Sequence, residues 1–248
     1  MKVTLFIPTF NEIVGVRAVM PRVKREWVDE IIVVDNSSTD GTREYFESLG
    51  IPVITQKTRG TIGAWWEGFQ AATGDVIITF SPDNNSVPEV IPQLIAKMKE
   101  GYDMVIASRY AKGATSEDDT LLSSVGNYVF TKSINILFGG HYTDSLVMYR
   151  AFRKDILKQI GFTAETGREH NKHLLGMFDM LSSIRCAKYG LKVAEIPGDE
   201  PARLDNSGSR VFPYLASRFR AAMLMFYHVG YEYFRKDLPK VAHHELHR

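Results

Sequence analysis

Short apolar runs alternate with longer amphipathic stretches through the first 110 residues. Short, mostly apolar runs predict buried strands at Val3–Ile7, Ile31–Val34, Val53–Thr55, Val76–Phe80 and Met104–Ser108. Between them, helical spacing predicts helices over Ile13–Lys24, Thr42–Leu49, Thr61–Ala72 and Pro88–Glu100. Such alternation predicts an α/β fold, with a mainly parallel central sheet flanked by helices.

The second half of the chain has a less regular pattern. It predicts helices over Leu121–Phe138, Ile156–Ile160 and Asn171–Tyr189, strands over Tyr149–Phe152 and Lys192–Ile196, and a terminal helix over Phe212–Phe234. The acidic stretch Ala111–Thr120 is interpreted as a mobile loop. We expect one domain over residues 1–210, followed by an aromatic and basic helix and tail over 211–248.

Small polar residues follow two of the predicted strands directly. Val3–Ile7 runs into Pro8–Glu12, and Ile31–Val34 runs into Asp35–Thr42. Ligands of open α/β sheets bind beyond the carboxyl ends of the strands, so the two loops predict a binding crevice. The simpler alternative is a loop carboxylate at Asp35 and an ordinary turn leading into the next helix.

The two loops at this spacing resemble the nucleotide-sugar-binding half of family-two glycosyltransferases, which have the GT-A fold. The resemblance covers about residues 1–210. Within the family, the chain is similar to dolichol-phosphate mannose synthase-like bacterial glycosyltransferases. It implies a single GT-A domain with a nucleotide-sugar half over about 1–110 and an acceptor half over about 111–210. It also implies that base and ribose are held by Pro8, Thr9, Glu12 and Asp35.

Asp83 lies where this family places a pair of aspartates that hold Mg²⁺ or Mn²⁺ against the donor diphosphate. The first aspartate position is Ser81 here, so Asp83 remains, with Asn85 as a second oxygen ligand. A divalent cation prefers oxygen ligands and neutralises charge on the departing diphosphate. The resemblance therefore implies a divalent metal cofactor, and the alternative is a turn at Pro82–Asn84.

Several basic residues occupy positions near the expected diphosphate. Arg59 and Gly60 open a predicted helix, whose N-terminus favours phosphate. Arg109 follows a strand, as in polyprenyl-phosphate members, and either binds phosphate or forms a structural ion pair. Arg203 and Arg210 match a loop that closes over the diphosphate in relatives, the alternative being a basic surface loop.

The resemblance assigns Asp144 and Arg150 to the acceptor side, although Asp144 equally suits a structural pair with Arg150 or Arg153. Many family-two enzymes carry a Glu-Asp pair, with Arg six and Gly eleven positions after the Asp. Asp179 keeps this spacing, with Phe178 in place of the Glu. Transfer to a hydroxyl needs a general base, and Asp179 is the candidate catalytic residue. The alternative is a solvated helical carboxylate.

The amino-acid composition and net charge limit the classes of partner that we expect for this protein. The 248 residues are 44% hydrophobic with a net charge of +1, which gives no reason to expect nucleic acid. The single cysteine, Cys186, excludes an internal disulfide and fits a reducing compartment. No apolar run reaches the ~18–20 residues of a membrane span, and no signal peptide is evident. We expect a cytoplasmic protein, or one peripheral to the inner face of the membrane. The terminal helix either contacts the membrane, packs on the domain or forms a homodimer.

The sequence therefore predicts an inverting glycosyltransferase that moves a sugar from a nucleoside-diphosphate sugar to a saccharide or lipid-linked acceptor. The main hypothesis is a hydroxyl acceptor in glycan or cell-surface polysaccharide synthesis. One alternative is a polyprenyl-phosphate glycosyltransferase, which would tolerate loss of Asp179. Another is a degenerate nucleotide-sugar-binding subunit, given Ser81 and Phe178. A nucleotidyltransferase is disfavoured, because residues 8–12 contain no glycine.

Overall fold

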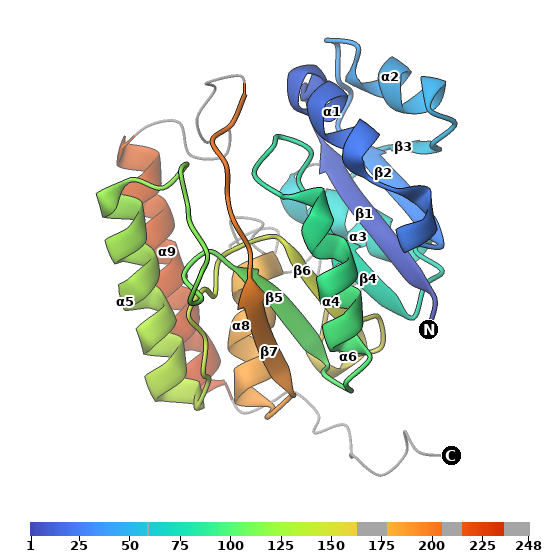
Figure 1. Ribbon diagram of the computed structural model, residues 1–248. Coiled ribbons are helices and arrows are strands. Elements are labelled where there is room, and N and C mark those ends of the chain that lie inside the picture. Colours follow the sequence, from blue (N-terminus) through green and yellow to red (C-terminus); the bar gives the residue numbers. More distant parts are fainter. Residues whose placement is uncertain (59, 163–177, 205–214, 236–248) are drawn as a thin grey trace.

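The computed structural model describes residues 1–58, 60–162, 178–204 and 215–235. Seven strands form one sheet in the order β3-β2-β1-β4-β6-β5-β7 (Figure 1). Their bounds are β1 Val3–Thr9, β2 Glu30–Asp35, β3 Val53–Thr55, β4 Val76–Thr79, β5 Met104–Ser108, β6 Arg150–Arg153 and β7 Val193–Pro197. All pairings are parallel except those of β6, which is antiparallel to β4 and β5. The predicted mainly parallel sheet is confirmed.

Helices cover both faces of this sheet. The longer ones are α1 Ile13–Val19, α2 Thr42–Ser48, α3 Thr61–Ala71, α4 Ile91–Met98, α5 Leu121–Phe138, α6 Ile156–Gln159, α8 Phe178–Lys188 and α9 Leu215–Phe234. In the described part of the chain, 3-10 turns lie at Met20–Arg22, Arg25–Trp27 and Pro88–Val90. The first helix is shorter than predicted, because Pro21 has no N–H for the α-helical ladder and a 3-10 turn follows Val19.

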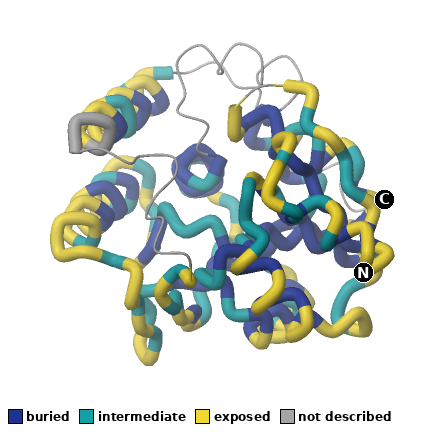
Figure 2. The backbone as a smooth tube through the Cα atoms, turned by 90° about the horizontal axis from the view of Figure 1, so that it is seen from above, coloured by how far each residue is buried: buried dark blue, intermediate teal, exposed yellow. Residues whose placement is uncertain are grey.

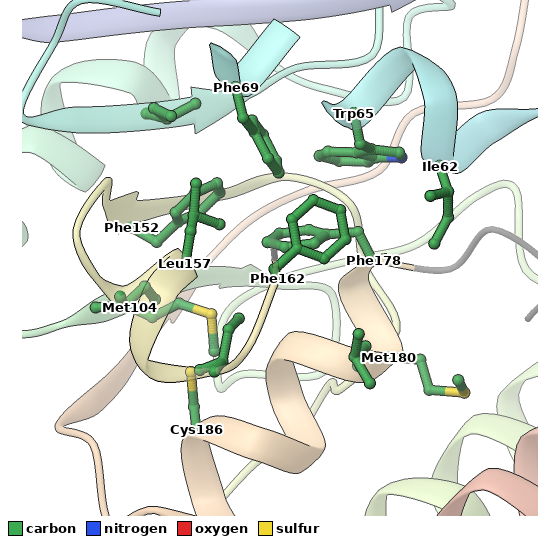
Figure 3. Packing of buried hydrophobic residues seen from close by; sticks show 14 of the residues in the cluster. Ile62, Trp65, Phe69, Met104, Phe152, Leu157, Phe162, Phe178, Met180 and Cys186 are labelled. Atoms are coloured by element: carbon green, nitrogen blue, oxygen red, sulfur yellow. The ribbon is translucent and has the colours of Figure 1, made fainter. Parts of the chain in front are cut away.

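The two faces enclose separate cores. One packs α1, α2 and α4 against the sheet, and the other packs α3, α5, α8 and α9 against the opposite face. Phe178, at the start of α8, lies at the centre of an aromatic cluster in the second core (Figure 3). Its ring centroid is 5.1 Å from that of Trp65 and 4.9 Å from those of Phe69 and Phe162. The start of α8 is therefore anchored by apolar packing.

The helix α9 is part of this packing. It lies beside α5 (Figure 1), where Phe226 meets Phe130 at 5.7 Å between ring centroids. None of the described helices has the length and hydropathy needed to cross a bilayer. A cavity of about 820 Å³ lies at the amino ends of β1 and β4, near Met1 and Val76. It is lined by none of the site residues predicted from the sequence.

Candidate active site

The loops that follow β1 and β2 are tied together by side chains. Asp35 ends β2 almost fully buried, and its carboxylate accepts hydrogen bonds from the backbone and hydroxyl of Ser38. The Ser38 hydroxyl in turn accepts from the Asn11 backbone N–H at 2.8 Å. Asp40 accepts from the N–H groups of Ile13 and Thr42. These bonds explain why both loops are rich in small polar residues.

Thr9 and Glu12 lie in this same corner. The Thr9 hydroxyl is buried and has no hydrogen-bond partner among the described residues. The Glu12 backbone N–H donates to the Thr42 hydroxyl at 2.9 Å. Asn11 has a φ of 54°, a left-handed conformation that asparagine tolerates better than most residues. Pro8, Thr9, Glu12 and Asp35 are therefore adjacent at the carboxyl ends of neighbouring strands, and their role in binding base and ribose stays a prediction.

The loop after β4 carries Asp83 and Asn85. The Asp83 carboxylate accepts from the Asn85 backbone N–H at 3.1 Å, and 9% of the residue is exposed. Gly15 of α1 packs directly beneath, where an added Cβ would lie 2.4 Å from the Pro82 carbonyl oxygen. A glycine at position 15 therefore allows α1 to support this loop closely.

Two distant segments meet the Asp83 loop. Arg203, in the segment after β7, has its Nε 3.4 Å from an Asp83 oxygen and 3.4 Å from an Asp118 oxygen. Asp118 comes from the 111–120 loop, and it accepts from the Asn85 side-chain amide at 3.0 Å. Asn84 also donates to the Ala202 carbonyl at 2.9 Å. The structure thus brings Asp83, Asn85 and Arg203 together.

The 111–120 loop is joined to the segment after β7 along its length. Ser116 and Glu200 form a parallel bridge, and the Glu117 N–H donates to the Glu200 carbonyl at 2.8 Å. The Thr115 N–H donates to the Asp199 carboxylate at 2.8 Å. This pairing fixes where Asp118 lies, whereas the sequence suggested only a mobile loop.

Arg109 is surrounded by carboxylates. Its Nε donates to Asp144 at 2.6 Å, while its Nη1 is 3.3 Å from Glu200 and 3.8 Å from Asp119. Asp144 is fully buried, and although burial opposes ionisation, the Arg109 guanidinium holds the pKa of Asp144 below its usual value. Of the two interpretations of Arg109, this geometry favours the structural ion pair. The partner of Asp144 is Arg109, not Arg150 or Arg153.

Arg150 and Asp179 face each other at the start of α8. Arg150 is fully buried, and its Nη1 donates to the Asp179 carbonyl and to the hydroxyls of Ser182 and Ser183 at 2.9–3.0 Å. The Asp179 carboxylate lies 3.8 Å from the Arg150 Nε, and its buried Oδ1 accepts no hydrogen bond from any described residue. Burial raises the pKa of Asp179 to about 6, against the opposing effect of Arg150. A carboxyl group with this pKa is mostly ionised at neutral pH and is therefore able to accept a proton.

The other members of the predicted Asp179 motif have structural roles. Phe178 fills the aromatic core, and Arg185 is fully buried against Glu232 of α9 at 2.6 Å. Burial raises the pKa of the Cys186 thiol to about 12, which agrees with inert packing. Gly60 precedes α3 with a φ of 86°, while Arg59 and Arg210 lie outside the described residues.

Sequence reasoning missed Asp118, Glu200 and Glu232. Each makes its contact with a residue more than 30 positions away, so no local spacing pointed to it. Within the described ranges, no three His, Cys, Asp or Glu side chains gather as metal ligands. The carboxylates that do come together are those of Asp83 and Asp118, each with an oxygen 3.4 Å from the Arg203 Nε. The Asn85 Oδ1 is buried and has no hydrogen-bond partner in the described structure, which is unusual for a buried polar atom and leaves this oxygen available to a ligand.

The curated proteins that are similar to this chain include several glycosyltransferases. The chain is 28% identical over 220 residues to glycosyltransferase AglJ of Haloferax volcanii, covering 85% of this chain and 67% of that protein. It is 30% identical over 191 residues to the dolichyl-phosphate hexose transferase of the same organism, covering 76% and 78%. The dolichol-phosphate mannosyltransferase of Pyrococcus furiosus is 38% identical over 126 residues, covering 48% of this chain and only 36% of that one.

Solved structures confirm the fold. Glucosyl-3-phosphoglycerate synthase from Mycobacterium tuberculosis, in complex with phosphoglyceric acid, superposes with a TM-score of 0.62 at 19% identity, covering 92% of this chain and 80% of that one. At this identity the likeness concerns the fold alone. The family model described as glycosyl transferase family 2 matches residues 4–161. With the loops at the strand ends and the GT-A sheet in place, this chain belongs to glycosyltransferase family 2.

Proposed function

We propose that this glycosyltransferase moves a sugar from a nucleoside-diphosphate sugar to a polyprenyl phosphate at a membrane surface. The observation that carries the proposal is a surface formed by α5 and α9, here named the α5–α9 surface. Its exposed side chains are Leu121, Leu122, Val125, Tyr128, Val129, Ile136 and Leu137 of α5, and Phe219, Met223, Phe226, Tyr227, Tyr231, Tyr233 and Phe234 of α9. So many neighbouring apolar side chains are uncommon on a water-facing surface.

The charge of the α5–α9 surface favours an anionic lipid bilayer as its partner. Residues 121–138 contain no Asp or Glu, and the one carboxylate in 215–234, Glu232, is buried against Arg185. Lys132 and Arg220 are exposed on these helices. In Figure 2 the two helices at the left, which are α5 and α9, are exposed on their outer sides and buried on their inner sides. Cations among aromatic and aliphatic side chains suit an interfacial helix.

The α5–α9 surface adjoins the candidate site. The helix α5 begins at Leu121, three residues after Asp118, so one loop leads from the Asp83 corner to the apolar surface. An acceptor whose phosphate enters the site and whose chain stays in lipid needs such continuity. Two relatives, named dolichyl-phosphate hexose transferase and dolichol-phosphate mannosyltransferase, support this acceptor class by name.

The proposed chemistry is a direct displacement that inverts the anomeric carbon. The loops at Thr9, Glu12 and Asp35 hold the nucleoside, and Asp83 and Asn85 would hold a Mg²⁺ or Mn²⁺ ion. When bound, the ion neutralises charge that develops on the departing diphosphate. The lipid phosphate attacks with an oxygen that is already anionic, so this chain need not supply a general base.

The test is a transfer assay with labelled nucleoside-diphosphate sugars and polyprenyl phosphate in vesicles, followed by extraction of lipid-linked sugar. A labelled lipid product that requires added Mn²⁺ or Mg²⁺ is expected. Transfer only to saccharide hydroxyls would contradict the polyprenyl-phosphate acceptor. If the chain binds the donor but shows neither sugar transfer nor slow hydrolysis of the donor, the result would instead identify a nucleotide-sugar-binding subunit.

A hydroxyl acceptor is the second candidate, and the observation that favours it is the raised pKa of Asp179, about 6. The variant Asp179→Asn separates the two. A hydroxyl-transferring enzyme would lose about 10²–10⁴-fold in kcat. A lipid-phosphate enzyme would keep its kcat within a few-fold, with Asp179→Asn checked for native folding by circular dichroism.

A further inference from the structure

The metal site implied by the family has lost one carboxylate. Ser81 stands where the resemblance expects the first aspartate, and a serine hydroxyl is a weaker ligand for a divalent cation. Asp83 alone would leave a doubly charged ion poorly neutralised. The question is whether another described side chain supplies the missing charge.

Asp118 is placed to do so. Asp83 Oδ2 and Asp118 Oδ2 each lie 3.4 Å from one atom, the Arg203 Nε, so both carboxylates already face a shared cationic centre. Asn85 connects them: its backbone N–H donates to Asp83 at 3.1 Å, and its side-chain amide donates to Asp118 at 3.0 Å. The remaining Asn85 oxygen is buried without a partner in the described structure.

We infer that Asp118 is the second carboxylate ligand of the divalent cation, replacing the aspartate lost at Ser81. The inference rests on the proposed function and deepens it. Arg203 then acts as an internal counter-ion, which holds Asp83 and Asp118 together until the cation takes its place. Once displaced, the guanidinium is available to the donor diphosphate, which it suits through bidentate hydrogen bonds. In this exchange the two carboxylates keep a positively charged partner, and the guanidinium gains the negatively charged diphosphate.

The loop that contains Asp118 is fixed in position by contacts with the segment after β7. Its pairing to Glu200 and Asp199 brings it beside the Asp83 loop, and the same segment after β7 delivers Arg203. Side-chain exposure of 31% for Asp118, 22% for Arg203 and 11% for Asp83 leaves the cluster reachable from solvent. A small cation can therefore enter without opening the core.

Mn²⁺ binding by electron paramagnetic resonance tests the inference on the full chain, with Mn²⁺ alone as probe. Asp118→Asn should weaken Mn²⁺ binding at least about tenfold, which is about 1.4 kcal/mol. The matched control is Glu117→Gln, which alters the neighbouring carboxylate and should leave Mn²⁺ affinity unchanged. Adding Ser81→Asp to Asp118→Asn should restore binding, because it returns a carboxylate to the same ion.

Arg203→Gln provides a readout that a purely structural ion pair would not give. Removing the competing guanidinium should strengthen Mn²⁺ binding and weaken the binding of nucleoside diphosphates. Unchanged Mn²⁺ affinity in Asp118→Asn, with binding lost in Asp83→Asn, would overturn the role of Asp118 and leave the donor site intact. If the unaltered chain binds no Mn²⁺, with or without a nucleoside diphosphate, the metal-dependent function fails as well.

Discussion

Asp179 has a protonation equilibrium that the fold perturbs strongly. Burial raises its pKa from the ordinary value of 3.8 to about 6, with Arg150 opposing. The folded chain therefore binds a proton that the unfolded chain has released between about pH 4 and pH 6. Since the native state holds more protons in that window, the free energy of unfolding falls as pH rises through it.

Asp179→Asn should remove this penalty. At pH 7.5 the variant should be more stable than the parent by up to about 2–3 kcal/mol, because a neutral amide avoids the cost of burying charge. The difference should shrink towards zero near pH 4, where the aspartate is protonated. Urea unfolding across this pH range checks it, and a difference independent of pH would show that burial does not perturb Asp179.

At the scale of elements, the contact between α1 and the Asp83 loop depends on Gly15. Gly15→Ala places a methyl group against the Pro82 carbonyl, 2.4 Å away before any movement. We expect a loss of about 1–3 kcal/mol in stability from this overpacking, with weaker Mn²⁺ binding as the loop shifts.

Gly126→Ala is the matched control for Gly15→Ala. It also lies within a helix, α5, but nothing lies within 4 Å of the added Cβ. It should gain about 0.5–1 kcal/mol from the better helix former. Urea unfolding and Mn²⁺ titration of both variants test the contrast; equal effects would mean that α1 does not hold the loop.

The helices α8 and α9 are joined by a buried ion pair. Arg185 and Glu232 are 0% and 1% exposed, and their pairing lowers the pKa of Glu232 although burial opposes it. Glu232→Gln leaves a buried guanidinium without its counter-ion and should cost about 3–5 kcal/mol in urea unfolding.

An exposed pair gives the comparison for Glu232→Gln. Glu100, whose side chain is 55% exposed, pairs with Lys97 at 2.7 Å. Glu100→Gln should cost no more than about 1 kcal/mol. A similar small cost for Glu232→Gln would mean that the α8–α9 junction relies on its apolar contacts alone.

The elements predicted from the sequence were those with a local pattern. Apolar runs such as Val3–Ile7 identified the strands, and the polar residues after them predicted that the Pro8–Glu12 and Asp35–Thr42 loops lie at neighbouring strand ends. The run Tyr149–Phe152 predicted a strand but not its direction, since so short a segment carries no information on parallel or antiparallel pairing. The position of Asp118 near Asp83 was not predicted, because it depends on pairing of the 111–120 loop with residues 199–200, which lie far along the chain.

At the scale of the whole molecule, the α5–α9 surface predicts binding to lipid vesicles. Leu122→Glu and Ile136→Glu each place a charge on it, at side chains that are 63% and 79% exposed. Loss of one buried apolar side chain costs about 1.5–3 kcal/mol, so vesicle affinity should fall at least about tenfold.

Co-sedimentation with vesicles of phosphatidylcholine, with and without phosphatidylglycerol, measures this affinity. Binding should be stronger to the anionic vesicles. Leu49→Glu, at an exposed leucine just after α2, is the control and should bind like the parent. Absence of vesicle binding, together with a dimer in analytical ultracentrifugation that Ile136→Glu dissociates, would assign the surface to a second copy of the chain.

The hydrogen bond between Asn84 and the Ala202 carbonyl spans 118 positions of the chain. A ribosome adds about 5–20 residues per second, so roughly 6–24 s separate the synthesis of the two partners. The contacts between the loops around Asn11 and Asp35 can form early in that interval, whereas the contacts of the Asp83 loop with Ala202 and Arg203 can form only after those residues are made. A nascent chain is therefore able to join the loops that follow β1 and β2 several seconds before Arg203 can reach the Asp83 loop.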